Sequence, residues 1–146
     1  DPTSWRSAIS WVPQSPTLVP GTILDNMGDL PQRDLDEAAR ATGFDAVLAT
    51  TPDGWNSVIG VGGVGLSVGQ RQRLALTRAL AAHSQIVILD EPTAHLDAVS
   101  EKTVVRAITT MRDEGRTVIV IAHRNAIIEV ADAIIDVVSA DEEALA

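Results

Sequence analysis

The apolar positions of the chain fall into short, nearly uninterrupted segments that predict strands. Residues 86–90 (IVILD) and 117–123 (TVIVIAH) are rich in β-branched residues, as strands are when a parallel sheet buries them on both faces. Residues 132–139 (DAIIDVVS) form a third segment of this kind. Residues 8–14 (AISWVPQ) predict a further strand, which enters a loop at Pro13.

Apolar residues at helical spacing occupy the intervals between these segments. From Ser67 onward they recur at Leu74, Ala75, Ala79 and Ala82. Asp97 is placed to cap a second helix that ends at Gly115. Alternating strands and helices predict an α/β fold with a parallel sheet core. The mainly helical residues 22–82 predict a helical insert before the sheet resumes.

Composition narrows the classes of function. The 146 residues carry a net charge of −9, which argues against nucleic-acid binding because a phosphate backbone selects a basic surface. The chain has no cysteine, and its three histidines lack metal-ligand spacing. No apolar run approaches the roughly 20 residues of a membrane helix. Because Asp1-Pro2 is not a natural translation start, we expect a fragment of a longer protein.

Polar side chains follow three of the predicted strands. Gln14, the adjacent pair Asp90 and Glu91, and His123 come at strand ends, where doubly wound sheets bind ligands. Adjacent acids there can divide their labour, one holding Mg²⁺ and the other polarising a water. The simpler interpretations are a solvated acidic turn, a histidine satisfied at a strand-to-helix turn and an ordinary loop glutamine.

The segment LSVGQRQRLALTRAL (66–80) suits an anion. Ser67 and Gln70 match a capping box, which alone would explain both side chains. Gly69 in the first helical turn costs up to about 1 kcal/mol against alanine, and it makes sense if a ligand approaches the backbone closely. The positive end of the helix favours a phosphate. Yet the chain has a single lysine, Lys102, with no glycine-rich loop around it.

A dinucleotide-binding module is an alternative interpretation. Gly60, Gly62 and Gly65 match G-x-G-x-x-G, and a predicted helix follows them. The strand before them, at best NSVI (56–59), is short and follows turn residues. This alternative also leaves Glu91 unexplained.

Four sequence phrases resemble, in order, motifs of the ATP-binding cassette (ABC) transporter family. They are VPQSPTLVPGTILDNM (12–27), LSVGQRQRLALTRAL (66–80), IVILDEPTAHLD (86–97) and VIVIAHR (118–124), similar to the Q-loop, signature, Walker B with D-loop, and H-loop. The resemblance implies a partial P-loop NTPase (ABC ATPase) domain of the exporter type. More narrowly, the signature resembles one subunit of the heterodimeric exporter of glutathione or cysteine required for cytochrome bd assembly.

The resemblance also implies roles at the strand ends. Gln14 would contact Mg²⁺ and the lytic water and couple to the membrane domain. Asp90 would hold Mg²⁺ through water, Glu91 would be the general base, and His123 would stabilise the γ-phosphate of ATP.

Other implied roles concern a second nucleotide-binding domain, in a homodimer or a heterodimer. Ser67, Gly69 and Gln70 would clasp the nucleotide bound by that partner, and Asp97 would lie at the dimer seam. Val68 departs from the glycine usual in the family.

The resemblance divides the chain into a strand with the Q-loop (1–21), a helical subdomain with the signature (22–82), a core from Walker B past the H-loop (83–140) and an acidic tail (141–146). In this family the lysine loop, called Walker A, precedes the Q-loop. The isolated chain is therefore expected to be inactive. The missing membrane domain would place it at the cytoplasmic face of the plasma membrane.

Two further alternatives share these motifs. DNA-repair and chromosome-organising ATPases interrupt the domain with a long coiled coil, but no heptad run lies between Gln14 and Ser67. A noncatalytic, truncated remnant is the other, although Glu91 and His123 are intact.

Overall fold

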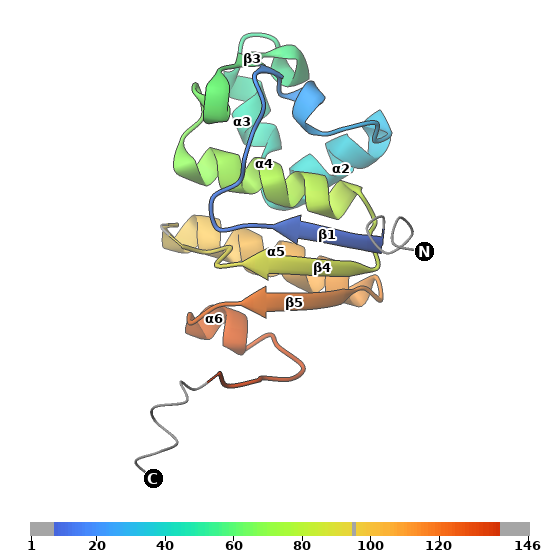
Figure 1. The fold of residues 1–146 in the computed structure, drawn as a ribbon, viewed down its shortest axis with the longest axis vertical. Coiled ribbons are helices and arrows are strands. Elements are labelled where there is room, and N and C mark those ends of the chain that lie inside the picture. The colour runs from blue at the N-terminus through green and yellow to red at the C-terminus, as the bar shows by residue number, and fades with distance from the viewer. Residues whose placement is uncertain (1–7, 95, 138–146) are drawn as a thin grey trace.

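A three-stranded parallel sheet forms the centre of the computed structural model, which describes residues 8–94 and 96–137. Strands β1 (Ile9–Val12), β4 (Ile86–Asp90) and β5 (Thr117–Ile121) lie in the order β1-β4-β5, so β4 is central (Figure 1). The register aligns Trp11 with Ile88 and Ile88 with Ile119. The predicted α/β fold with a parallel sheet core is thereby confirmed.

The two faces of the sheet differ in burial. Helix α5 (Ala98–Asp113) lies against the far face in Figure 1. Val12, Val87 and Leu89 are fully buried, whereas Trp11 and Ile119 on the opposite face are exposed. The prediction that β4 and β5 are buried on both faces was therefore wrong for β5, because within the described residues only one face is covered.

The third predicted strand is absent from the part that the structure describes. Residues 132–137 form neither strand nor helix, and Ile134, Ile135 and Val137 are exposed. β5 is the edge strand, so this apolar segment does not pair with the sheet. Its last two residues and the predicted acidic tail 141–146 lie outside the described residues.

Helices and short turns form a second layer beside the β1 edge of the sheet (Figure 1). It contains α2 (Gln32–Thr42), α3 (Asp45–Thr50), α4 (Val68–Ala81) and the antiparallel pair of β2 (Gly21–Thr22) with β3 (Val58–Ile59). The 3₁₀ turns are η1 (Leu24–Asn26), η2 (Gly54–Asn56) and η3 (Val61–Gly63), and a short helix α6 (Asn125–Ile128) follows β5. The proposed boundary of a subdomain at 22–82 stays a prediction.

Buried side chains join the helical layer to the sheet. One continuous core contains Leu35 and Phe44 from the region of α2 and α3, Leu74 from α4, and Leu89 from β4. Because α4 contributes to this core along much of its length, its first turn is held in a fixed place relative to the strand ends.

Candidate functional site

The carboxyl ends of the three strands meet at one edge of the sheet, since the strands are parallel. Asp90 ends β4, Gln14 follows β1 as an exposed residue, and His123 follows β5. The Glu91 amide donates to the Ile121 carbonyl at 2.8 Å, which continues the β4–β5 pairing beyond the strand. The structure thus places all of the predicted strand-end residues at the same edge.

Glu91 and His123 form a direct contact. The Nδ1 of His123 lies 3.0 Å from Oε1 of Glu91, and the carboxylate accepts the hydrogen bond. The His123 side chain is 77% exposed, whereas that of Glu91 is only 22% exposed. With Nδ1 engaged, the histidine directs Nε2 outward, where a ligand oxygen can reach it.

The second oxygen of Glu91 is unusual. Oε2 is buried and has no hydrogen-bond partner in the described part of the chain. A buried carboxylate oxygen without a partner is costly, and such groups often mark sites for water or an ion. Asp90 lies directly beside it in sequence at the strand end, so two carboxylates are present where Mg²⁺ and an attacking water fit chemically.

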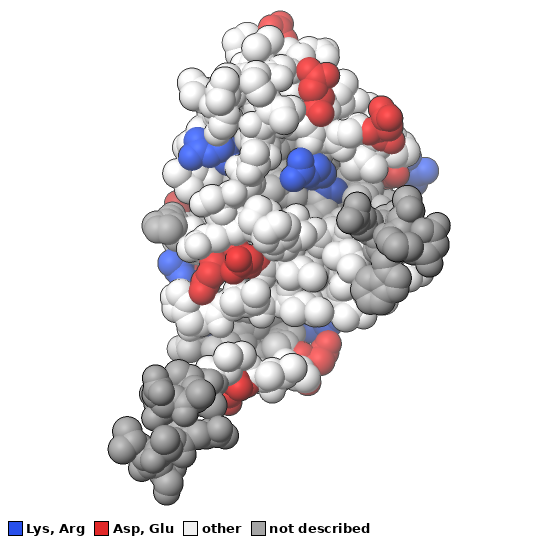
Figure 2. Space-filling model, viewed as in Figure 1, with Lys and Arg blue, Asp and Glu red and all other residues white. Residues whose placement is uncertain are grey.

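Acidic side chains gather over the carboxyl ends of the strands, next to a mostly uncharged surface (Figure 2). The described residues contain no group of three His, Cys, Asp or Glu side chains able to hold a metal ion by themselves. A divalent ion at this edge would therefore need phosphate or water oxygens in addition to Asp90, as is usual for Mg²⁺.

The start of α4 carries the predicted capping box. The Ser67 hydroxyl accepts from the Gln70 amide at 3.2 Å, and the Gln70 side-chain oxygen accepts from the Ser67 amide at 2.8 Å. A Cβ added to Gly69 would lie 3.4 Å from the Leu96 side chain. Val68 is exposed. In the first turn, therefore, the side chain of residue 68 faces open space, whereas a side chain at residue 69 would contact Leu96.

Asp97 caps α5, as its spacing predicted. Its Oδ1 accepts from the Ser100 amide at 2.7 Å. The backbone hydrogen bond from Ser100 lowers the pKa of Asp97 below its usual value, with a smaller contribution from the positive charge of Arg73. The Asp97 carboxylate is therefore favoured in its ionised form. Its hydrogen bond to the Ser100 amide also fixes the start of α5 relative to the preceding loop.

Sequence reasoning missed the side chains that connect these segments. Arg73 on α4 donates to the Ser100 hydroxyl at 2.7 Å, and Arg124, next to His123, pairs with Glu101. No short spacing signals these pairs, because their members lie 27 and 23 positions apart.

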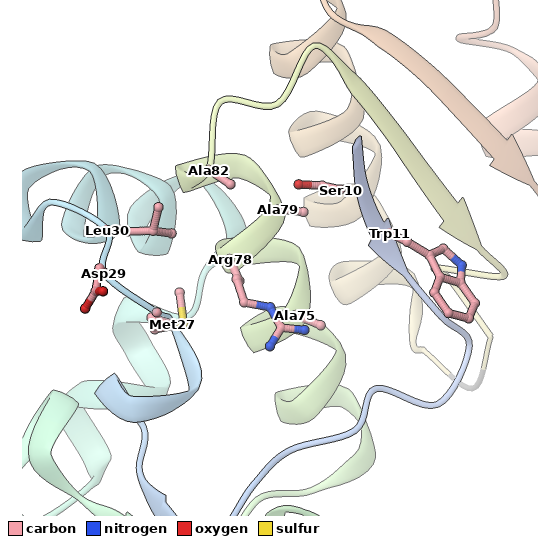
Figure 3. A pocket seen from close by; sticks show the side chains of 10 residues that line it. Ser10, Trp11, Met27, Asp29, Leu30, Ala75, Arg78, Ala79 and Ala82 are labelled. Atoms are coloured by element: carbon pink, nitrogen blue, oxygen red, sulfur yellow. The ribbon is translucent and has the colours of Figure 1, made fainter. Parts of the chain in front are cut away.

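A cleft of about 330 Å³ lies at the other end of α4, away from the strand ends (Figure 3). Arg78 points into it and donates to the Asn26 carbonyl at 3.1 Å, and burial lowers the pKa of Arg78. Trp11 points to the opposite side of β1. The walls of the cleft are mainly apolar, and the Arg78 guanidinium is bonded to the backbone. Asp29 is the one carboxylate among the lining residues, whereas the strand ends carry the adjacent pair Asp90 and Glu91.

The structure does not support the alternative that the chain is a dinucleotide-binding module. The strand before Gly60 is the two-residue β3, which pairs antiparallel with β2 and is not part of the parallel sheet. A dinucleotide fingerprint needs a glycine turn between a parallel strand and its helix. The glycines at 60, 62 and 65 instead build a turn, with Gly62 and Gly65 at positive φ.

Known proteins are similar to this chain in sequence and in fold. The family model described as "ABC transporter" matches residues 1–94. The ABC multidrug transporter MDR2 of Trichophyton interdigitale is 41% identical over 137 residues, and the ABC-type transporter atr1 of Mycosarcoma maydis is 38% identical over 144. These matches cover 90% and 92% of the chain but only 10% of each relative, so the chain spans about a tenth of their length.

A solved structure of an ABC exporter is similar to this chain in fold. A bacterial Atm1-family ABC exporter, determined with ATP bound, aligns with a TM-score of 0.78 and 34% identity. The alignment covers 89% of the chain and 23% of the exporter. The described residues include no helix that is long and apolar enough to cross a membrane. Its motifs, parallel sheet and relatives place the chain in the ABC transporter family, with a partial ABC ATPase fold.

Proposed function

We propose that the chain is part of the ATP-hydrolysing module of an ABC exporter. The observation that carries this proposal is the 3.0 Å contact between Glu91 and His123 at the strand ends. It joins a carboxylate with one free, buried oxygen to an exposed imidazole at the edge where parallel sheets bind ligands. The exporter-type relatives support the direction of transport.

In this proposal the chain's side chains divide the chemistry. Glu91 accepts a proton from the attacking water, and His123 holds the carboxylate in place through Oε1. As an imidazolium, with a proton on each ring nitrogen, His123 would donate from Nδ1 to Glu91 and from Nε2 to a γ-phosphate oxygen. Gln14 would orient the water with its uncharged amide. Asp90, with Gln14, would hold Mg²⁺, which neutralises phosphate charge when it is bound.

The first turn of α4 would serve a second nucleotide-binding domain, in a homodimer or a heterodimer. Ser67, Gly69 and Gln70 present a helix start with little steric bulk at Gly69, where backbone amides attract a phosphate. Asp97 would lie at the seam between the two domains. The capping box uses the amides of Ser67 and Gln70, so the amides of Val68 and Gly69 remain to face the nucleotide.

The proposal includes an upstream segment that supplies the phosphate-cradling lysine loop. The only lysine of these 146 residues, Lys102, lies within α5. Within residues 8–94 and 96–137, the face with Trp11, Ile119 and Ile121 is exposed, and parallel sheets usually have both faces covered, which supports a further layer on this side. We expect these 146 residues alone neither to bind ATP tightly nor to hydrolyse it, because they contain no glycine-rich lysine loop.

A transmembrane domain would place this module at the cytoplasmic face of the plasma membrane. The signature resemblance suggests glutathione or cysteine as the cargo, whereas several relatives are named multidrug transporters. The test is ATP-dependent uptake by inside-out vesicles that contain the complete exporter. We expect glutathione or cysteine to accumulate with ATP but not with a non-hydrolysable analogue.

Uptake of hydrophobic drugs alone would retain the ATPase proposal and reject the thiol cargo. Absence of both ATP hydrolysis and uptake would favour a noncatalytic remnant and reject the proposed function.

A further inference from the structure

The first turn of α5 lies where three functional segments meet. The Ser100 side chain accepts from Arg73 Nη2 at 2.7 Å, and Arg73 lies one helical turn beyond the capping box of α4. The Ser100 amide donates to Asp97 Oδ1 at 2.7 Å. One residue therefore links the start of α4 to the loop before α5.

Glu101, the next residue, makes the corresponding link to the end of β5. Its carboxylate pairs with Nη1 of Arg124, which directly follows His123. The same nitrogen of Arg124 lies 3.5 Å from the Leu96 carbonyl, so Arg124 also touches the loop that carries Asp97.

These contacts are sheltered enough to hold positions. Ser100 is 6% exposed, and the side chains of Glu101 and Arg124 are 19% and 35% exposed. The Nε of Arg73 is buried and has no hydrogen-bond partner in the described ranges, so its guanidinium depends on the bond to Ser100. Losing the partner of a buried charged donor costs more than losing an exposed pair.

We infer that Ser100 and Glu101 are positioning residues that make the signature helix, the Asp97 loop and the His123 segment move as one unit. The inference rests on the proposed function. If the signature serves the nucleotide on the partner while Glu91 and His123 serve the domain's own nucleotide, a rigid hub ties the two sites together. Neither side chain touches the reacting atoms. Both act by holding residues that do.

Ser100→Ala in the complete exporter tests the first half of the hub. Alanine removes the hydroxyl that accepts from Arg73 and that also helps to lower the pKa of Asp97, but it keeps the amide that donates to Asp97, so the helix cap survives. We expect kcat for ATP to fall about tenfold, since a hydrogen bond to a charged group is lost, while KM for ATP changes little. Thr109→Ala is the matched control, because this α5 hydroxyl bonds only within its own helix, to the Arg106 carbonyl.

Arg73→Gln and the double variant complete this cycle. The double variant should be no slower than Ser100→Ala alone, because both changes break the same link. If Ser100→Ala lowers the melting temperature, the kcat of Arg73→Gln becomes the deciding measurement. This variant breaks the same hydrogen bond from the α4 side and leaves the sequence of α5 unchanged. An unaltered kcat in both single variants would overturn the inference.

Glu101→Gln and Arg124→Gln test the second half in the same way. We expect each to lower kcat with little effect on KM, and the pair to be less than additive. Fully additive effects would show that the two side chains act independently and would overturn the hub. A wild-type exporter that does not hydrolyse ATP would instead reject the proposed function, so the two failures are distinguishable.

Discussion

Glu91 has a left-handed backbone. Its φ is +48°, and His83 (+50°) is the other non-glycine residue at positive φ in the described ranges. Residues with a Cβ pay about 1–2 kcal/mol for this conformation. The strain aims the Glu91 side chain at His123 from the turn just after β4, which is consistent with a functional rather than a stabilising role.

The strain at Glu91 can be measured directly. Glu91→Gly and Glu91→Ala both remove the carboxylate, but only glycine adopts positive φ without strain. We expect the glycine variant of the 146-residue chain to be more stable than the alanine variant by about 1 kcal/mol in urea unfolding. Equal stability of the two variants would mean that the backbone at Glu91 is not strained.

Exchanging glycine and valine at positions 68 and 69 should affect ATP turnover at position 69 but not at position 68. Gly69→Val places methyl groups toward Leu96 and blocks close approach of a phosphate to the backbone, so ATP turnover of the complete exporter should fall about a hundredfold. Val68 is exposed, and Val68→Gly should change turnover little while costing on the order of 0.5 kcal/mol of helix stability. Turnover at saturating ATP is the measurement. The reverse pattern would mean that Val68 faces the phosphate.

Helices α2 and α4 are joined by a buried pair of hydroxyls. The Oγ1 atoms of Thr42 and Thr77 lie 2.6 Å apart, and both residues are fully buried. Each hydroxyl also lies close to a carbonyl of its own helix, Thr77 to that of Arg73 at 2.7 Å and Thr42 to that of Ala38 at 3.0 Å, so either one can be the donor within the pair. This bond fixes α2 against the helix that begins with the signature.

Replacing these threonines with the isosteric valine tests the link between the helices. We expect Thr42→Val and Thr77→Val each to lower the free energy of unfolding by about 1 kcal/mol. The double variant should lose clearly less than the sum, because two apolar side chains of the same shape leave no unpaired hydroxyl. Thr109→Val on α5 is the control, because this hydroxyl bonds only to the Arg106 carbonyl of its own helix. Strict additivity would show that the two hydroxyls do not interact.

Local sequence patterns predicted the helices and strands well, but they predicted less well which side chains are buried. The helix from Ser67 with its capping box, the cap at Asp97 and the strands at 86–90 and 117–121 follow from spacing that acts within a few residues. The strand expected at 132–139 failed because apolar composition does not specify a pairing partner. The exposure of Ile119 depends on which layers cover the sheet, and no local pattern contains that information.

At the scale of the whole molecule, part of the site followed from topology. Glu91 and His123 meet because two parallel strands that end in polar residues are neighbours, a short inference from the sequence. The bond from Arg73 to Ser100 required the packing of α4 against α5, which the sequence does not specify.

Glu91→Gln in the complete exporter tests the central claim most directly. Glutamine keeps the shape of the side chain but cannot accept a proton, so ATP turnover should fall by about 10²–10⁴-fold while ATP still binds. Glu129→Gln is the control and should leave turnover unchanged. Glu129 is an exposed acidic residue that follows His123 in the sequence. Turnover by Glu91→Gln equal to that of the wild type would contradict the account.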